Sequence, residues 1–341
     1  MTTLQGIILQ KKQEIAKITE NPTLSAFDNE YCERLDKLAT TDSFIAKKIR
    51  EIIKELNSAG RVDYNDHYRT AYNNYNEAVC YYELKNKGFK ISNIPGSRKQ
   101  STPDFEIEFS YDNWSGEEEN VKIYIEVKSL SFANGNNLYK EIQEKALNCN
   151  IELEEQRKKG KQICTTILEI SPLGYNGCGL TFEIEEINKK INNNIKPKQY
   201  QYGKGEDTIL LIDSSQYIFP FKLEDCLPIY PNIENKCCVS GRLWMLAFGK
   251  KNERIFGCPE FEGKCCFDKD LEHSGILVCN DNIKGIIFTS GTSYSDKVFY
   301  GFYRYNDRDL AVVPFLSESC NFVNDDLNTF GFKVYEKNMI K

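Results

Sequence analysis

Three charged residues on two neighbouring segments have the types and spacing needed to hold a divalent metal ion. Asp104 directly follows Pro103, and Glu126 and Lys128 flank Val127 further along the chain. Both segments alternate polar and apolar residues, which predicts strands, and this alternation puts Glu126 and Lys128 on one face. If the two strands form a hairpin, Asp104 reaches the same face. The sequence therefore predicts a cluster of two carboxylates and one amine.

This predicted cluster suits hydrolysis of a phosphate ester. Two close carboxylates repel each other unless a proton or a cation lies between them. Carboxylate oxygens are hard ligands that favour Mg²⁺ or Mn²⁺, and water and phosphate oxygens complete the coordination. The metal would activate water, and Lys128 would orient that water or offset phosphate charge. We therefore expect Asp104 and Glu126 to be metal ligands and Lys128 to be catalytic.

A fourth acidic residue lies on a helix predicted before these strands, at about residues 65–87. Glu77 shares one helical face with Cys80, Tyr81 and Leu84, which are expected core residues. A carboxylate on an inward helix face needs a partner or a metal ion. Glu77 is therefore a further candidate for the catalytic and metal-binding set.

Each of these residues also has a structural interpretation, which stays open at this point. Glu126 and Lys128 would form a solvent-facing ion pair on an edge strand. Asp104 would be a turn residue after proline. Glu77 would be a surface charge at the edge of its helix, because the tyrosine stripe of that helix points elsewhere.

The elements that must position these residues alternate between helices and strands. Residues 1–60 show helical periodicity, and so do residues 65–87, 138–159 and 183–194. The strands expected up to residue 218 are 89–94, 103–109, 121–129, 162–170 and 208–213. This order predicts an α/β protein with one mixed sheet flanked by helices.

The chain divides into three expected regions. Residues 1–62 form an N-terminal helical region, and residues 63–218 form the core that carries the candidate site. Residues 219–341 form a β-rich, cysteine-rich C-terminal region, either a separate domain or an extension of the sheet. Its expected strands are 243–248, 275–279, 285–288, 298–303 and 311–313.

The motifs and their order resemble the PD-(D/E)xK nuclease superfamily, which has the restriction-endonuclease-like fold with an αβββαβ core. The resemblance rests on Glu77, on Pro103-Asp104 and on the sequence from Glu126 to Lys128, and it covers about residues 65–215. It implies that Asp104 and Glu126 ligate Mg²⁺, that Lys128 positions or activates water, and that Glu77 supports the metal.

The same resemblance implies an endonuclease that acts on DNA, with a role in restriction or antiviral defence ahead of DNA repair. Some members of the superfamily carry a glutamine on the helix after the third strand, where Gln143 is the candidate. Leu147 stands where a tyrosine usually follows that glutamine.

A stretch rich in lysine and tyrosine offers candidate contacts to nucleic acid. Lysines bind phosphates, and tyrosines stack on bases. The residues are Lys189, Lys190, Lys196, Lys198, Tyr200 and Tyr202. A solvated helix end and loop would have the same composition.

Composition and charge limit the class of protein. The net charge of −6 argues against a protein that coats nucleic acid non-specifically, but an acidic catalytic cluster is compatible with it. No apolar run is long enough for a membrane span or a signal peptide, so we expect a cytoplasmic protein with reduced thiols. A zinc site in the C-terminal region is the alternative to buried free thiols, and its candidates are Cys237, Cys238, Cys258, Cys265, Cys266 and His273.

Three alternatives to a DNA nuclease stay open. The chain could be a catalytically inactive relative that binds nucleic acid or acts as a scaffold, or it could cleave RNA. It could also bind a protein partner through the cysteine-rich region. Expected partners besides nucleic acid are a second copy of the chain, which would suit cleavage of both strands, or another protein of the same system.

Overall fold

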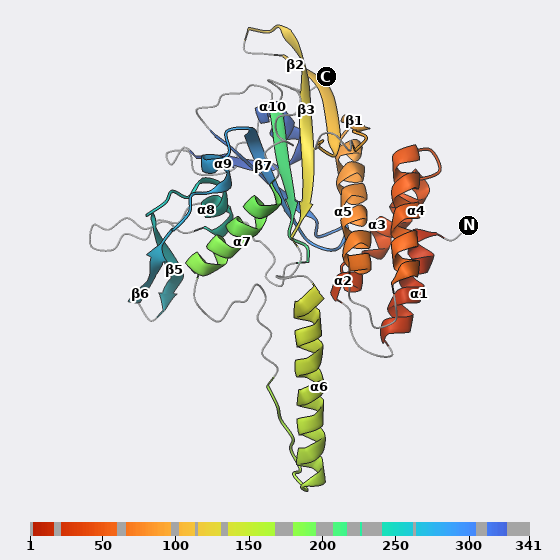
Figure 1. Ribbon diagram of the computed structural model, residues 1–341. Helices are drawn as coiled ribbons and strands as arrows, with labels where there is room; N and C mark the ends of the chain where they lie inside the picture. Colours follow the sequence, from red (N-terminus) through yellow and green to blue (C-terminus); the bar gives the residue numbers. More distant parts are fainter. Residues whose placement is uncertain are drawn as a thin grey trace.

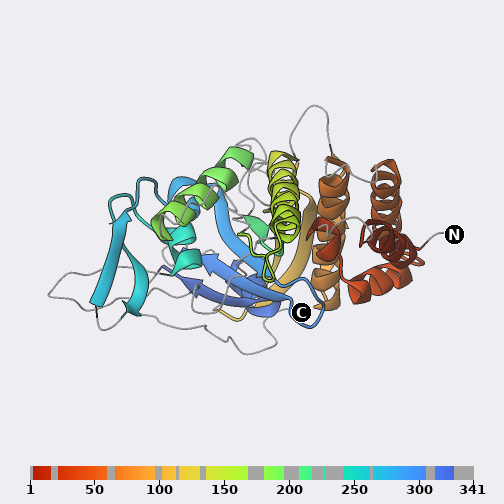
Figure 2. The ribbon, with the colours of Figure 1, turned by 90° about the horizontal axis from the view of Figure 1, so that it is seen from below.

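The computed structural model has a mixed sheet between two layers of helices (Figure 1, Figure 2). It describes residues 3–16, 22–59, 66–96, 102–112, 115–130, 136–167, 180–195, 207–216, 226, 241–261, 264–304 and 312–325. Within these residues no helix has the length and apolar character needed to cross a membrane. The α/β class expected from the sequence is confirmed.

The main sheet has seven strands in the order β1-β2-β3-β4-β7-β8-β9. These strands are β1 (Lys90–Asn93), β2 (Phe105–Asp112), β3 (Glu118–Ser129), β4 (Asp207–Asp213), β7 (Ile283–Ser290), β8 (Val298–Tyr303) and β9 (Asn321–Asn324). β1, β2 and β3 are antiparallel, whereas β3, β4 and β7 are parallel. β8 is antiparallel to β7 and parallel to β9. The parallel central strands bring the carboxyl ends of β3 and β4 to one edge.

The N-terminal region is helical, as predicted. Its helices are α1 (Leu4–Ala16), α2 (Pro22–Ser25), α3 (Asn29–Leu38) and α4 (Ser43–Ser58), and α5 (Asp66–Asn86) follows. Asp42 caps α4 by accepting hydrogen bonds from the N–H groups of Phe44 and Ile45. Gly88, at φ +91°, ends α5 in the left-handed conformation expected of a glycine after a helix.

Each face of the sheet buries its own hydrophobic core. On one face, Phe105, Ile125 and Ile209 pack with the tyrosines of α5 and with α4. On the other, Leu210 and Ile212 pack with α7 (Leu180–Asn194) and α8 (Arg242–Phe248). Helices therefore cover the central strands on both sides, which explains their nearly continuous apolar sequences.

The C-terminal region contributes three strands, β7, β8 and β9, to the same sheet. A separate two-stranded sheet consists of β5 (Arg254–Phe261) and β6 (Lys264–Asp270). The central strand β4 thus has neighbours from both halves of the chain, β3 on one side and β7 on the other.

Three of the strands predicted in the C-terminal region are helices, so those predictions were wrong. Residues 243–248 belong to α8, residues 276–279 form α9 (Ile276–Cys279), and residues 312 and 313 begin α10 (Val312–Ser319), while residue 311 lies outside the described residues. All seven residues of α8 are buried. A short apolar run does not distinguish a buried strand from a buried helix, because neither shows a solvent-facing period.

The strand predicted at 162–170 is also wrong for residues 162–167, which have no strand partner in the described part of the chain. They follow the long helix α6 (Asn136–Lys158) and run back beside it, while residues 168–170 lie outside the described residues. The helices predicted at 138–159 and 183–194 are confirmed as α6 and α7.

Candidate functional site

The β2–β3 hairpin brings Asp104 to the end of β3. The backbone N–H of Asp104 donates to the carbonyl oxygen of Ile125 at 3.0 Å. Its side-chain Oδ2 accepts from the N–H of Val127 at 2.8 Å. These two hydrogen bonds fix the carboxylate of Asp104 beside the backbone that joins Glu126 to Lys128.

Glu126 and Lys128 lie together on β3 and form an ion pair. Glu126 is buried, with 2% of its surface exposed, and the side chain of Lys128 is about one quarter exposed at 26%. Val127, between them, belongs to the core on the α5 side, so the pair lies on the opposite face. The structure thus brings Asp104, Glu126 and Lys128 to one end of the hairpin.

Three carboxylates interact electrostatically here. Burial raises the pKa of Asp104 to about 7, and repulsion from Glu126 acts in the same direction. Burial also raises the pKa of Glu77 to about 7, with added repulsion from Asp104. Asp104 therefore interacts with both Glu77 on α5 and Glu126 on β3. An ionised carboxylate at Asp104 costs free energy because both neighbours are acidic.

Lys48, on α4, is a member of the cluster that the sequence did not reveal. Its ammonium forms an ion pair with Glu77 and donates to Oδ1 of Asn74 at 2.9 Å. Lys48 also lowers the pKa of Asp104 and of Glu77, against the effect of burial. In the sequence Lys48 stands out only as a lysine beside the apolar stripe of α4. Many solvated lysines occupy such a position.

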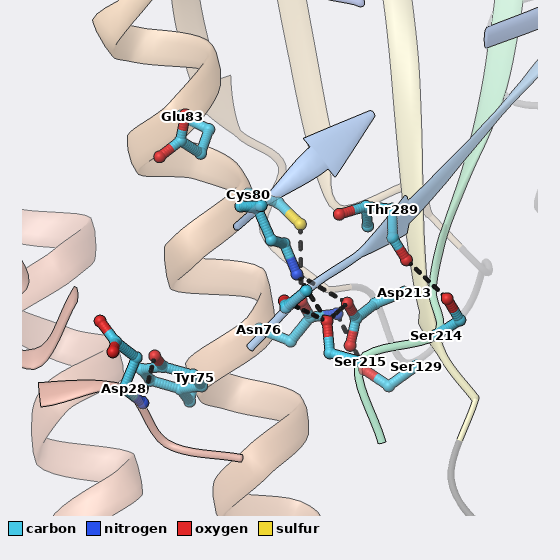
Figure 3. A network of polar contacts seen from close by, with 12 residues as sticks. Asp28, Tyr75, Asn76, Cys80, Glu83, Ser129, Asp213, Ser214, Ser215 and Thr289 are labelled. Atoms are coloured by element: carbon cyan, nitrogen blue, oxygen red, sulfur yellow. Dashed lines mark hydrogen bonds and ion pairs between the residues drawn. The ribbon is translucent and has the colours of Figure 1, made fainter. Parts of the chain in front are cut away.

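A polar network supports the cluster from the α5 side of the sheet (Figure 3). Asn76, next to Glu77, donates to Oγ of Ser129 at 2.9 Å, and Ser129 directly follows Lys128. This hydrogen bond joins the helix and the strand that carry the candidate residues.

The same network contains a buried ion pair at the end of β4. Nζ of Lys297 lies 2.7 Å from Oδ1 of Asp213, and their side chains are 5% and 0% exposed. Asp213 also accepts from the hydroxyl of Ser215 at 2.5 Å (Figure 3). The hydroxyl of Tyr72 donates to Asp213 as well, at 2.9 Å. No pattern in the sequence indicates this pair, because its members are distant in the chain.

The candidate nucleic-acid contacts are described only in part. Lys189 is exposed on α7. Burial, followed by the nearby guanidinium of Arg69, lowers the pKa of Lys190 to about 8. Gln143 lies in α6, but its side chain is outside the described part. Four further candidates also lie outside it, namely Lys196, Lys198, Tyr200 and Tyr202.

Of the candidate zinc ligands, only His273 has a described side chain. Cys237 and Cys238 lie outside the described residues, and the side chains of the cysteines on β5 and β6 do too. Nδ1 of His273 contacts Oε2 of Glu185 at 2.7 Å. Over the described ranges, no three His, Cys, Asp or Glu side chains gather as one metal-binding group.

The pair Asp104 and Glu126 nevertheless fits a magnesium ion by its chemistry. Mg²⁺ commonly keeps several waters and takes only one or two protein carboxylates, with substrate phosphates in other positions. Both carboxylates offer hard oxygen donors, and burial, with repulsion from Glu126, raises the pKa of Asp104. A divalent cation would relieve that repulsion. Glu77, paired with Lys48, would support the site from outside the ligand pair.

No protein-family model, no curated protein and no solved structure matches this chain.

Proposed function

We propose that this protein is a metal-dependent nuclease that hydrolyses phosphodiester bonds, with DNA as the expected substrate ahead of RNA. The observation that carries the proposal is the position of Asp104, bound to the N–H of Val127 and next to Glu126 and Lys128. Two acids and an amine at the end of one hairpin are the groups that phosphodiester hydrolysis requires.

The surrounding fold supports the same proposal. A helix carrying Glu77 precedes three antiparallel strands, and after the helices α6 and α7 the strand β4 lies parallel to β3. This arrangement agrees with the restriction-endonuclease-like core implied by the PD-(D/E)xK motifs. A role in restriction or antiviral defence is proposed on that resemblance.

The chain's own residues have distinct roles in the proposed reaction. Asp104 and Glu126 would hold a Mg²⁺ or Mn²⁺ ion, which supplies an activated water and stabilises charge on the phosphate. The N–H of Val127 orients Asp104 by its hydrogen bond. Lys128, ion-paired with Glu126, would turn its ammonium to the water or to the scissile phosphate once a cation neutralises Glu126. Lys48 holds Glu77 in place.

An inactive nucleic-acid-binding or scaffold protein is the second candidate, and one observation favours it. Lys128 and Lys48 already neutralise Glu126 and Glu77 without any metal ion. A structural ion-pair cluster would have the same appearance. The two candidates differ in whether divalent ions bind and whether phosphodiester bonds break.

The first prediction concerns cleavage. Plasmid DNA and single-stranded RNA are incubated with the protein in Mg²⁺, Mn²⁺ or EDTA, and the products are resolved on gels. We expect cleavage of DNA that requires the divalent ion and falls at least about a hundredfold in Glu126→Gln and Lys128→Met.

The same hairpin offers matched controls for this assay. Glu106 and Lys122 form an ion pair with each other at 3.1 Å on β2 and β3, rather than with Asp104, Glu126 or Lys128, so Glu106→Gln and Lys122→Met should cleave like the wild type. Equal activity in all four variants would point to a contaminant. If the wild type bound nucleic acid without cleaving it, the result would favour the inactive nucleic-acid-binding or scaffold protein.

A further inference from the structure

The ammonium group of Lys48 lies where oxygen atoms from two helices converge. Lys48 belongs to α4, which packs side by side with α5 (Figure 1). Its Nζ forms an ion pair with Glu77 on α5 and donates to Oδ1 of Asn74, also on α5, at 2.9 Å. Oε2 of Glu51 lies 3.7 Å from the same nitrogen. Two carboxylates and one amide oxygen therefore surround a single positive charge.

These oxygens are of the kind that binds a divalent metal ion, and they adjoin the proposed metal site. Mg²⁺ and Mn²⁺ prefer carboxylate and amide oxygens as ligands. Burial raises the pKa of Asp104, and the positive charge of Lys48 opposes that rise. Burial and then repulsion from Asp104 raise the pKa of Glu77. The ammonium thus acts on a proposed metal ligand and on the acid that supports it.

The side chain of Lys48 is held in this position by its surroundings. Only 13% of it is exposed, and the ring of Phe44, one turn earlier on α4, lies 5.8 Å from Nζ. Ile45 and Ile49, on either side of Lys48 in the same helix, are buried in the core shared with α5. An ammonium fixed in this way repels any divalent ion that approaches the same oxygens.

We propose that Lys48 takes the place of a second metal ion, so that the site binds a single divalent ion between Asp104 and Glu126. This inference rests on the proposed function, because it concerns the same site. The fixed ammonium compensates the charge of Glu77 and Asp104, as a second ion would, and cleavage then requires only one bound ion. If Lys48 were only a structural partner of Glu77, its removal would create no site for an ion.

The test is the number of Mn²⁺ ions that the full chain binds at about pH 8, measured by calorimetric titration. Electron paramagnetic resonance shows whether two bound ions are close enough to couple magnetically. The wild type should bind a single ion. Lys48→Ala and Lys48→Gln should each bind a second ion that is coupled to the first. Both variants keep the oxygens of Glu51, Asn74 and Glu77, and glutamine can also donate to Glu77 and so protect the fold.

Two further variants serve as controls. Lys47 is exposed and lies 3.8 Å from Glu51, so Lys47→Ala should still bind a single ion. Lys48→Ala/Glu77→Gln lacks the carboxylate closest to the ammonium, so the second ion should be lost again. Thermal unfolding in EDTA shows that each variant is folded before its ions are counted.

A wild type that binds two coupled ions would overturn the inference. Folded Lys48 variants that still bind a single ion would also overturn it, and the proposed function would survive if Asp104→Asn abolished that ion. A wild type that binds no ion would overturn both. If neither Lys48 variant folds, Glu77→Gln decides the question. It should keep the single ion, and its loss would make Glu77 a ligand of that ion and contradict the inference.

Discussion

At the scale of single residues, the unusual feature is that Asp104 is held close to two other acids. Its hydrogen bond to Val127 fixes its direction, and repulsion from Glu126 adds to the effect of burial on its pKa. The geometry that would bind a cation therefore destabilises the cation-free protein. Such a conflict between stability and local charge is characteristic of functional sites.

The second prediction follows for Asp104→Asn. Asparagine keeps a side-chain oxygen that can accept from Val127 but carries no charge, so the metal-free protein should gain roughly 1–2 kcal/mol at pH 8. Thermal unfolding in EDTA measures this gain. A lower melting temperature than that of the wild type would show that the carboxylate stabilises the fold.

The sign of the pH dependence follows from the raised pKa values. Asp104 and Glu77 bind protons more tightly in the folded state than in the unfolded chain. The contribution of these two carboxyl groups to the free energy of unfolding of the metal-free protein should therefore be highest in acid, and it should fall as pH rises from about 4 to about 7. Other groups add their own dependence, so the difference between the wild type and Asp104→Asn is the quantity to compare.

The third prediction concerns Lys48. Its ammonium lowers the pKa of Asp104 and of Glu77. In Lys48→Met both values should rise further, so that divalent-ion binding shifts to higher pH by about half a unit or more. The control is Lys47→Met, because Lys47 is exposed and contacts only Glu51 at 3.8 Å among the ion pairs described. If Lys48→Met and Lys47→Met bound divalent ions with the same pH profile, Lys48 would have no role in the site.

At the scale of elements, the site depends on contacts between parts that are distant in the chain. Asn76 on α5 binds Ser129 on β3, and Lys297 before β8 binds Asp213 on β4. These contacts hold the carboxyl ends of the two parallel strands against the helix that carries Glu77. They are also the features that the sequence did not reveal.

The fourth prediction tests this element-scale support. Lys297→Met leaves the buried carboxyl group of Asp213 without its cation, which should cost about 3–5 kcal/mol in the free energy of unfolding. Asp213→Asn/Lys297→Met should recover part of that loss. Urea unfolding measures both, with Lys269→Met as an exposed control. If Lys297→Met were as stable as the wild type, the ion pair would contribute nothing to stability.

The sequence predicted the features that depend on local patterns and missed those that depend on contacts between distant residues. The alternation around Ile107 and Ile125 identified β2 and β3, and the motif from Glu126 to Lys128 lay on one strand, so local patterns were sufficient. Lys48 and Lys297 reach their partners only through tertiary packing. The apolar run Leu243–Phe248 was misassigned because a fully buried helix shows no amphipathic period.

At the scale of the whole molecule, the strands from the C-terminal region are part of the structure that holds the site. β7 pairs with β4 along six residue pairs, and the residues of β4 from 209 to 212 are fully buried. β4 in turn pairs with the part of β3 that carries Glu126 and Lys128. The core therefore needs both halves of the chain.

The fifth prediction concerns truncation at the boundary expected from the sequence. A fragment of residues 1–218 lacks β7, β8 and β9, so β4 would become an exposed apolar edge. We expect this fragment to be insoluble or rapidly cleaved by protease, whereas deletion of the β5–β6 hairpin (residues 254–270) should leave a protected core. A stable, folded fragment would mean that residues 219–341 form an independent domain.

Calorimetric titration of Mn²⁺ into the metal-free protein tests most directly whether the acidic cluster is a cation site. The wild type and Glu106→Gln should bind the ion, and below about pH 7 binding should release protons from the carboxylates. Asp104→Asn and Glu126→Gln should lose this binding. Undiminished binding in both variants, or no binding by the wild type at pH 8, would contradict the assignment of Asp104 and Glu126 as metal ligands.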